Sequence, residues 1–260
     1  MIQANEFNGK VVLVTGASQG IGLEIARQFS ELGACVIMVG RHSEKLDIAK
    51  NSINNNFKIF TYACDLSNES EIEGLFTFIR KKFQRLDFLV NNVGAYSEKT
   101  AWNEIDYDLW LKTFETNVLS AYFCMVRAAD IMAANQTGGA IVNIGSSAAL
   151  HLKKGRLHYS VTKSSLHTLS RVAAMELAKQ RIRVNVVSPG PTATETVKKW
   201  MADPELREQE EIRRKKIPLG RYAEPVEIAN AVVFLCSNMA EFITCAILPV
   251  DGGYTIGETV

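Results

Sequence analysis

The chain has 260 residues, of which 47% are hydrophobic, with a formal net charge of +1 and a pI near 7.6. This near balance of charge offers no long-range attraction for nucleic acids or acidic membranes, so we expect neither as a partner. The first residues lack the apolar core of a signal peptide, and five widely spaced cysteines form no metal-ligand pattern. We therefore expect a cytoplasmic protein with reduced thiols, no metal and no membrane span.

Short apolar runs rich in β-branched residues alternate with helical patterns along the whole chain. That alternation is typical of repeated βα units around a parallel sheet whose strands are buried on both faces. We predict a single domain, residues 1–260, with a doubly wound α/β Rossmann fold of about seven parallel strands and helices on both faces. The expected strands are Val11–Thr15, Cys35–Val39, Ile59–Cys64, Phe88–Asn91, Ala140–Ile144, Arg183–Ser188 and Ala246–Val250.

The first expected strand ends in the sequence TGASQGIG, with Gly16, Gly20 and Gly22 at the start of the first helical pattern. Glycines in this position turn the chain sharply, let the backbone approach a pyrophosphate, and leave the helix N-terminus free to receive negative charge. The sequence therefore predicts a phosphate site here. Gly33, after the last residue of that helical pattern, is expected to form its left-handed C-terminal cap.

The end of the second expected strand indicates which dinucleotide is bound. NAD enzymes usually present an acidic residue to the ribose 2′-hydroxyl at this point. This chain instead has Gly40 at the strand end, followed by Arg41. A guanidinium can pair with a 2′-phosphate, and Ser43 can add a hydroxyl contact. The sequence favours NADP(H) over NAD(H), although Arg41 can also be read as a solvated residue at the start of the next helix.

Four further helices are expected along the chain. One begins after Ser43, and another begins after Ser67 or Asn68 with Glu71 as its capping-box partner. Two longer ones span 107–135 and 158–179 and are apolar on more than one face, which indicates burial against a second copy of the chain as well as against the sheet. We expect a homo-oligomer, either a dimer or a tetramer.

Tyr159 and Lys163 stand four residues apart in the last of these helices, so they share one helix face. The simplest interpretation is a tyrosine packed on a lysine stem. The chemical interpretation is that a phenol, whose pKa is near 10, becomes a useful proton donor and acceptor when an ammonium stabilises its anion. That second interpretation makes sense beside a bound cofactor, which the glycine-rich turn would supply.

The chain resembles the short-chain dehydrogenase/reductase family in a series of motifs that occur in the family's order. They are TGASQGIG, CDL at 64–66, NNVG at 91–94, NIGS ending at Ser146, the pair Tyr159 and Lys163, and SPG at 188–190 with Thr194. The resemblance implies that Tyr159 is the general acid/base, that Ser146 binds the reacting oxygen, that Lys163 also holds the nicotinamide ribose, and that Asn117 supports a proton path. It also implies a nicotinamide cofactor held by Gly16, Ser18, Gln19, Gly20, Ile21, Gly22, Arg41, Ser43, Asp65, Leu66, Asn92, Gly94, Tyr159, Lys163, Pro189, Gly190, Thr192 and Thr194. Cys245 replaces a glycine that relatives usually have, and we expect this to be neutral.

The resemblance implies a small-molecule carbonyl or alcohol substrate, either a 3-oxoacyl thioester or a small ketone. The expected pocket residues besides Ser146 and Tyr159 are Tyr96, His151, Arg156 and Trp200. The sequence HLKKGR at 151–156 places several cations near the pocket, which suits either an anionic or carrier-bound substrate or a solvated loop.

The charged segment Glu205–Lys216 is expected to be a solvated helix face, with a lid over the pocket as the alternative. Two other functions stay open for the whole chain. These are a different reaction on the same fold, such as dehydration or epimerisation, and a cofactor-binding sensor without turnover.

Overall fold

The computed structural model describes residues 6–53, 58–95, 99–135 and 137–256. The described residues form one seven-stranded parallel sheet in the order β3-β2-β1-β4-β5-β6-β7. The strands are β1 (Val11–Thr15), β2 (Cys35–Gly40), β3 (Ile59–Ala63), β4 (Phe88–Asn91), β5 (Gly139–Ile144), β6 (Ile182–Pro189) and β7 (Ile247–Val250). All seven expected strands are confirmed, and their ends agree to within one residue.

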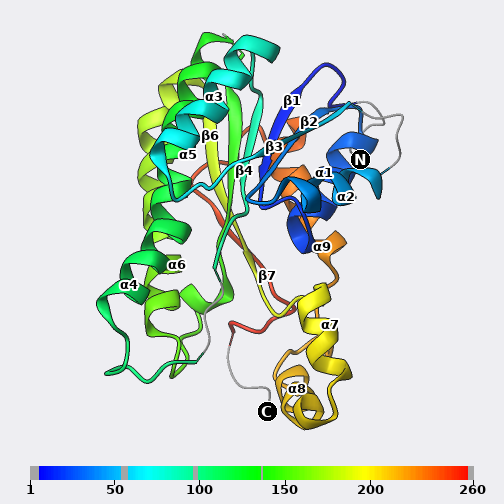
Figure 1. Cartoon of the computed structure of the whole chain (residues 1–260), viewed down its shortest axis with the longest axis vertical. Coiled ribbons are helices and arrows are strands. Elements are labelled where there is room, and N and C mark those ends of the chain that lie inside the picture. Colours follow the sequence, from blue (N-terminus) through cyan, green and yellow to red (C-terminus); the bar gives the residue numbers. More distant parts are fainter. Residues whose placement is uncertain (1–5, 54–57, 96–98, 136, 257–260) are drawn as a thin grey trace.

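Helices cover both faces of this sheet (Figure 1). One face carries α1 (Gly20–Glu31), α2 (Ser43–Asn51) and α9 (Pro225–Cys236), and the other carries α3 (Glu69–Phe83), α5 (Ser120–Ala134) and α6 (Leu157–Leu177). Helix α4 (Tyr107–Phe114) precedes α5, while α7 (Glu195–Ala202) and α8 (Pro204–Lys215) extend beyond the end of the sheet (Figure 1). The doubly wound Rossmann-type fold expected from the sequence is confirmed.

Each central strand contributes to two hydrophobic cores. In β1, Val12 and Val14 pack into the core with α1 and α9, while Val11 and Leu13 pack into the core with α3, α5 and α6. Successive side chains of a strand point to opposite faces, so a strand covered by helices on both sides needs an apolar residue at every position. This requirement explains the continuous apolar run VVLV.

The strand order reverses direction between β1 and β4, which are adjacent although β2 and β3 separate them in sequence. The connections from these two strands leave to opposite sides and open a crevice at the carboxyl ends of the strands. In open α/β sheets, ligands bind in such a crevice. The topology therefore places the glycine-rich turn after β1 and the loop after β4 at the position where a site is expected.

Two helix starts differ in detail from expectation. Asn68 caps α3 by accepting a hydrogen bond of 3.0 Å from the Ser70 amide, but Glu71 does not close a capping box, because its carboxylate accepts from the Asp65 amide at 2.8 Å instead. Helix α2 begins at Ser43 itself, with His42 as its N-cap residue. Gly33 has the positive φ of 92° expected of a C-terminal cap.

Cys245 has a φ of 65°, in the left-handed region that favours glycine. The expectation of a neutral replacement is therefore wrong, since a side chain at such a position costs roughly 1 to 3 kcal/mol. Within the described part of the chain, none of the helices is both long and apolar enough to span a bilayer. The same residues hold no group of three or more His, Cys, Asp or Glu side chains that could bind a metal ion.

Candidate active site

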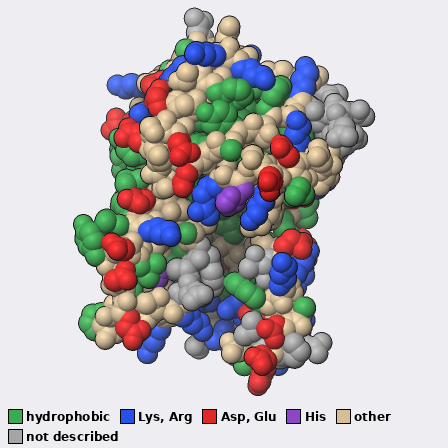
Figure 2. Space-filling view, viewed as in Figure 1, with side chains coloured by type: hydrophobic (Ala, Val, Ile, Leu, Met, Phe, Trp, Pro, Cys, Tyr) green, Lys and Arg blue, Asp and Glu red, His purple; other side chains and the backbone are tan. Residues whose placement is uncertain are grey.

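A cleft of about 890 Å³ lies at the carboxyl ends of the strands. Figure 2 shows it as a hollow near the middle of the molecule, with Lys, Arg and His side chains at its rim. Most residues predicted to hold a cofactor line it: Gly16, Ser18, Gln19, Gly20, Ile21, Arg41, Asp65, Leu66, Asn92, Gly94, Tyr159, Lys163, Pro189, Gly190, Thr192 and Thr194. The fold thus brings together segments that are up to 178 positions apart in the sequence.

The glycine-rich turn leads from β1 directly into helix α1. Gly16 and Gly20 have φ values of 62° and 58°, which only glycine adopts without strain. Helix α1 begins at Gly20, and its N-cap residue Gln19 makes no side-chain hydrogen bond to the helix. A helix N-terminus that faces a cleft without a capping side chain offers its amide groups to an anion, so the turn suits a pyrophosphate.

Gly22 does not line the cleft, and its position has a different explanation. A Cβ atom at residue 22 would lie 2.3 Å from the Gly16 carbonyl oxygen and 2.5 Å from Asn92 Nδ2. Asn92 Nδ2 in turn donates to the carbonyl oxygens of Thr15 at 3.0 Å and Gly16 at 3.1 Å. The absence of a side chain at Gly22 therefore lets the turn pack against the loop after β4.

The end of the cleft beyond β2 is lined by basic side chains and one acidic side chain. Arg41 is joined there by His42 and Lys45, which the sequence interpretation did not single out, whereas Ser43 is not among the lining residues. Asp65 faces the same space, and its Oδ1 accepts hydrogen bonds from the Ser67 amide at 3.0 Å and hydroxyl at 2.8 Å. These hydrogen bonds, with the charge of Arg41, lower the pKa of the Asp65 carboxyl, so it is ionised at neutral pH.

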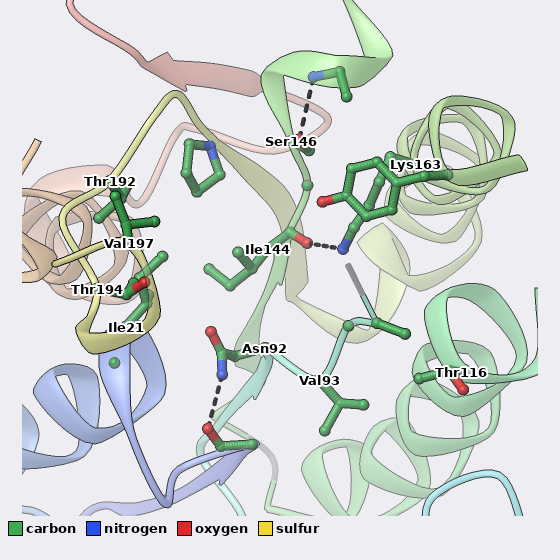
Figure 3. Close-up of a pocket in the computed structure, with 18 of the residues that line it drawn as sticks. Ile21, Asn92, Val93, Thr116, Ile144, Ser146, Lys163, Thr192, Thr194 and Val197 are labelled. Atoms are coloured by element: carbon green, nitrogen blue, oxygen red, sulfur yellow. Dashed lines mark hydrogen bonds between the residues drawn. The ribbon is translucent and has the colours of Figure 1, made fainter. Parts of the chain in front are cut away.

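Ser146, Tyr159 and Lys163 converge on the cleft from the end of β5 and from the first turns of α6. The Lys163 ammonium donates to the Ile144 carbonyl oxygen at 2.9 Å, and the Ala148 amide donates to Ser146 Oγ at 3.1 Å. In Figure 3, Ser146 and Lys163 lie across the cavity from Thr192, Thr194 and Val197. The arrangement places a hydroxyl and a buried cation on one wall, with the residues after β6 on the other.

Lys163 is only 3% exposed, and this burial lowers the pKa of its ammonium from 10.5 to about 8. His167, one turn further along α6, is also buried, and burial together with the charge of Lys163 lowers the pKa of His167 to about 4. A neutral His167 at physiological pH adds no second charge beside the ammonium. Gly145 makes room for the His167 ring, because a Cβ at residue 145 would lie 2.3 Å from His167 Nε2.

Replacing Lys163 by Met should stabilise the cofactor-free fold at pH 7, and the advantage should shrink as the pH rises from 8 to 10.5. The folded pKa is lowered, so below pH 8 the lysine is charged in both states and the full burial penalty, on the order of 3 kcal/mol, opposes folding. Above pH 8 the folded lysine loses its proton first, and the penalty fades. The lost bond to Ile144 offsets about 1 kcal/mol of the gain.

Urea unfolding across this pH range checks the expectation, with the exposed Lys179→Met substitution as the control that shows no such trend. An advantage of Lys163→Met that grows with pH contradicts it.

Asn117 lies behind the cleft and not on its surface. It is fully buried in a π-helical turn (Glu115–Leu119) between α4 and α5, so the expected helix over 107–135 is interrupted at this residue. Its Oδ1 accepts from the Ala95 amide at 2.8 Å, and its Nδ2 donates to Thr162 Oγ1 at 3.0 Å. A Cβ at Gly94 would lie 3.1 Å from Lys163 Nζ and 3.5 Å from Asn117 Oδ1, so this glycine leaves room between the two side chains.

The opposite end of the cleft contains three of the predicted pocket residues, His151, Arg156 and Trp200. The fourth, Tyr96, lies outside the described residues. Lining residues that the sequence interpretation missed come from α4, from the π-helical turn, from α8 and from the last segments of the chain: Lys112, Glu115, Thr116, Arg213, Tyr222 and Tyr254.

Most of the described side chains of helix α8 are exposed, as its composition predicts, but one turn of the helix faces the rest of the protein. Glu210 is 8% exposed and accepts hydrogen bonds from the Tyr222 hydroxyl and from Arg213, the latter at 2.7 Å. Arg213 and Tyr222 both line the cleft. The charged segment therefore forms part of the pocket wall. Its alternation of charges gave no signal for this, because the partner, Tyr222, lies beyond the end of the segment.

Comparisons with known proteins agree with this architecture. Residues 16–255 match a family model described as enoyl-(acyl carrier protein) reductase. The chain is 36% identical over 248 residues to a 3-oxoacyl-(acyl-carrier-protein) reductase of Rickettsia typhi, covering 95% of this chain and 98% of the relative. It is 35% identical to a 3alpha-hydroxysteroid dehydrogenase of Mediterraneibacter gnavus, covering 94% and 96%.

A solved short-chain type dehydrogenase/reductase from Mycobacterium ulcerans superimposes with a TM-score of 0.89 at 30% identity, covering 97% of this chain and 92% of that one. The matches extend over nearly the whole chain, in sequence and in structure. The chain belongs to the short-chain dehydrogenase/reductase family of oxidoreductases.

Proposed function

We propose that this protein is an NADP(H)-dependent oxidoreductase that reduces a ketone or oxidises the corresponding secondary alcohol, with residues 1–260 acting as one cofactor-binding and catalytic domain. The observation that carries the proposal is the convergence of Ser146, Tyr159 and Lys163 on a cleft whose other end is a glycine-rich helix N-terminus. Such a cleft fits a dinucleotide and a small carbonyl compound side by side.

When bound, the cofactor supplies a hydride for the carbonyl carbon. Tyr159 gives its phenolic proton to the carbonyl oxygen, and Ser146 Oγ donates a hydrogen bond that stabilises the charge developing on the same oxygen. The Lys163 ammonium lies in the same wall, where its positive charge favours the phenolate form of Tyr159. In the oxidative direction the same groups act in reverse.

Asn117 supports the site from behind. Its amide joins the Ala95 backbone to Thr162, whose hydroxyl donates to the Tyr159 carbonyl oxygen at 2.9 Å. These contacts fix the start of α6 relative to the loop after β4. We propose that Asn117 also supports a proton path behind Lys163, in accord with the space that Gly94 leaves between them.

The preference for NADP(H) rests on the end of the cleft beyond β2. Arg41, His42 and Lys45 line it, and no carboxylate occupies the position after Gly40 that a ribose 2′-hydroxyl would need. Arg41 can pair with a 2′-phosphate in a bidentate manner. Ser18 lines the cleft near Gly40 and offers a hydroxyl to the same group.

The substrate proposal covers two classes, a 3-oxoacyl thioester and a small cyclic or secondary-metabolite ketone. Relatives with similar identity act in one case on a 3-oxoacyl group and in the other on a hydroxysteroid, according to their names. Assays of a panel of both classes with NADPH and with NADH test the proposal. Reduction of at least one ketone, faster with NADPH, is the expected result, and no turnover of either class with either cofactor overturns it.

We also propose a homo-oligomer. Tyr122 and Val126 on α5, and Val172 and Met175 on α6, are 36% to 75% exposed although apolar. Helices that keep such residues on their outer surface are suited to pack against a second copy of the chain. A cytoplasmic location stays a prediction from the sequence.

A further inference from the structure

Cationic side chains gather at the end of the cleft that lies beyond the catalytic residues. They come from four segments of the chain, namely the loop before α4, α4 itself, the loop before α6, and α8. The lining cations are Lys99, Lys112, Lys153, Lys154, Arg156 and Arg213, whereas the lining acids in this part of the cleft are Glu115 and Glu195. The surface is therefore strongly positive where the part of a substrate remote from its carbonyl would lie.

Among these cations, Lys153 makes defined contacts with one aromatic residue, Tyr254. Its ammonium donates to the Tyr254 hydroxyl and lies 4.5 Å from the centroid of the Tyr254 ring. Within the described residues, no carboxylate lies close enough to Lys153 for an ion pair. Partial burial of the ammonium, followed by the charges of Arg213, Lys216, Arg156 and Lys99, lowers the pKa of Lys153 to about 8.

The partner of Lys153 is held firmly in place. Tyr254 is 4% exposed and packs with Ala193, Ile217 and Tyr222 in a small hydrophobic cluster. The turn that carries it is closed by Asp251, whose carboxylate accepts from the amides of residues 253 and 255 at 2.9 and 3.0 Å. The Lys153 ammonium is thus positioned by a buried ring, so an anion that binds it meets a preformed site.

Arg213 does not supply the same uncompensated charge. Glu210 accepts from its guanidinium at 2.7 Å, and this carboxylate neutralises it. Lys153 is held by a neutral phenol, and the nearby charges that act on it are all cationic. An added anion would relieve this repulsion, whereas a neutral ligand would leave it unchanged.

Lys153 and the phenol of Tyr159 line the same cleft and lie near one another in the sequence. Arg156 is the N-cap residue of α6, and Tyr159 follows three residues later, about one helical turn away on the same face. Lys153 stands in the loop that leads directly into this helix. Ala148, Val197 and Trp200 line the cleft as well, and they offer apolar surface for a short hydrocarbon body.

We propose that the physiological substrate carries a carboxylate, and that Lys153 binds it while Tyr159 faces the reacting carbonyl. The substrate class is then an oxocarboxylate with a short apolar chain between its two functional groups, or the corresponding hydroxycarboxylate. This inference rests on the proposed function, the reduction of a ketone, and adds an acidic ketone to its substrate classes. It assigns to Lys153 and Tyr254 the recognition of one end of the molecule.

The test compares 5-oxohexanoate and 6-oxoheptanoate with their methyl esters, in the wild type, in Lys153→Gln and in the exposed control Lys179→Gln. Lys153→Gln should lower kcat/KM for the better acid by about 10- to 100-fold, the range of one lost charge-assisted hydrogen bond, mainly through KM. It should leave the esters within about 2-fold. The control should change neither. Equal kcat/KM for acids and esters in the wild type, or an equal loss for both in Lys153→Gln, overturns the inference.

Calorimetric binding of hexanoate and methyl hexanoate, without turnover, separates this inference from the proposed function. Binding of hexanoate that Lys153→Gln abolishes, in a protein that reduces no ketone, supports the carboxylate subsite and overturns the proposed reaction. Reduction of the acids as well as the esters without any dependence on Lys153 overturns the subsite and supports the proposed reaction. Hexanoate binding that is absent, or unchanged in the variant, overturns the subsite whatever the assays show.

Discussion

Tyr159→Phe should lower kcat by about 100- to 10,000-fold, the range of general acid–base catalysis, and should leave the affinity for NADPH within about 3-fold. The substitution removes the hydroxyl and retains the ring. It therefore takes away the proposed proton donor, which lies on the same wall as Ser146 and Lys163, and preserves the shape of the cleft. The Lys163 ammonium, which donates to Ile144, keeps its position.

Stopped-flow assays of ketone reduction, together with fluorescence titration of NADPH, measure both parts of this prediction. The matched control is Tyr107→Phe on α4, because Tyr107 is 74% exposed and lies outside the cleft. A Tyr159→Phe enzyme with a kcat near that of the wild type contradicts the role given to the phenol. A loss of NADPH affinity as large as the loss of kcat shows that the ring serves binding instead.

Arg41→Asp should reverse the cofactor preference. The kcat/KM for NADPH should fall by about 100- to 1,000-fold, because one charge-assisted contact is lost and a carboxylate is placed where a 2′-phosphate would bind. The kcat/KM for NADH should stay level or rise, since an acidic residue at the end of the second strand is suited to a ribose 2′-hydroxyl. The effect is expected to be large because Asp65, already ionised, lines the same end of the cleft.

Steady-state kinetics with both cofactors give the ratio directly. Arg214→Asp on α8 makes the same change of charge at an exposed position outside the cleft, and its ratio should match that of the wild type. A ratio that Arg41→Asp leaves unaltered contradicts the assignment of Arg41 to the 2′-phosphate. In that case Arg41 is a solvated residue just before α2.

The fold could be predicted from the sequence because its signals are local. Each strand is a short, continuous apolar run such as VVLV in β1, and each such run needs helices on both faces. The glycine-rich turn is equally local, since Gly16 and Gly20 need positive φ values within the turn itself. These features depend on neighbouring residues, and the sequence displays them directly.

The features that the sequence did not reveal depend on contacts between distant residues. Lys153 donates a hydrogen bond to Tyr254, which lies 101 positions further along the chain. Glu210 accepts a hydrogen bond from the hydroxyl of Tyr222, which lies beyond the end of helix α8. Gly22 was predicted to face the cofactor, but the structure uses it to pack the turn against Asn92. No local pattern encodes such partners, because any of several polar residues could satisfy a given group and only the fold selects one.

The π-helical turn at Asn117 illustrates the same limit. The helical pattern over 107–135 continues through it without interruption, yet the backbone widens at 115–119. The turn brings the Asn117 side chain to the Ala95 backbone, which belongs to the loop after β4. The sequence pattern carries no sign of this tertiary contact, and π-helical turns are often found at functional sites.

The most direct test of the account follows the transferred hydrogen. A reducible ketone is incubated with NADPH that carries deuterium at C4 of the nicotinamide, and the alcohol product is analysed by mass spectrometry and NMR. The account predicts one deuterium on the carbinol carbon when the label is on the transferred face, and a hydroxyl proton that comes from solvent. A product that lacks deuterium with either face labelled would contradict it.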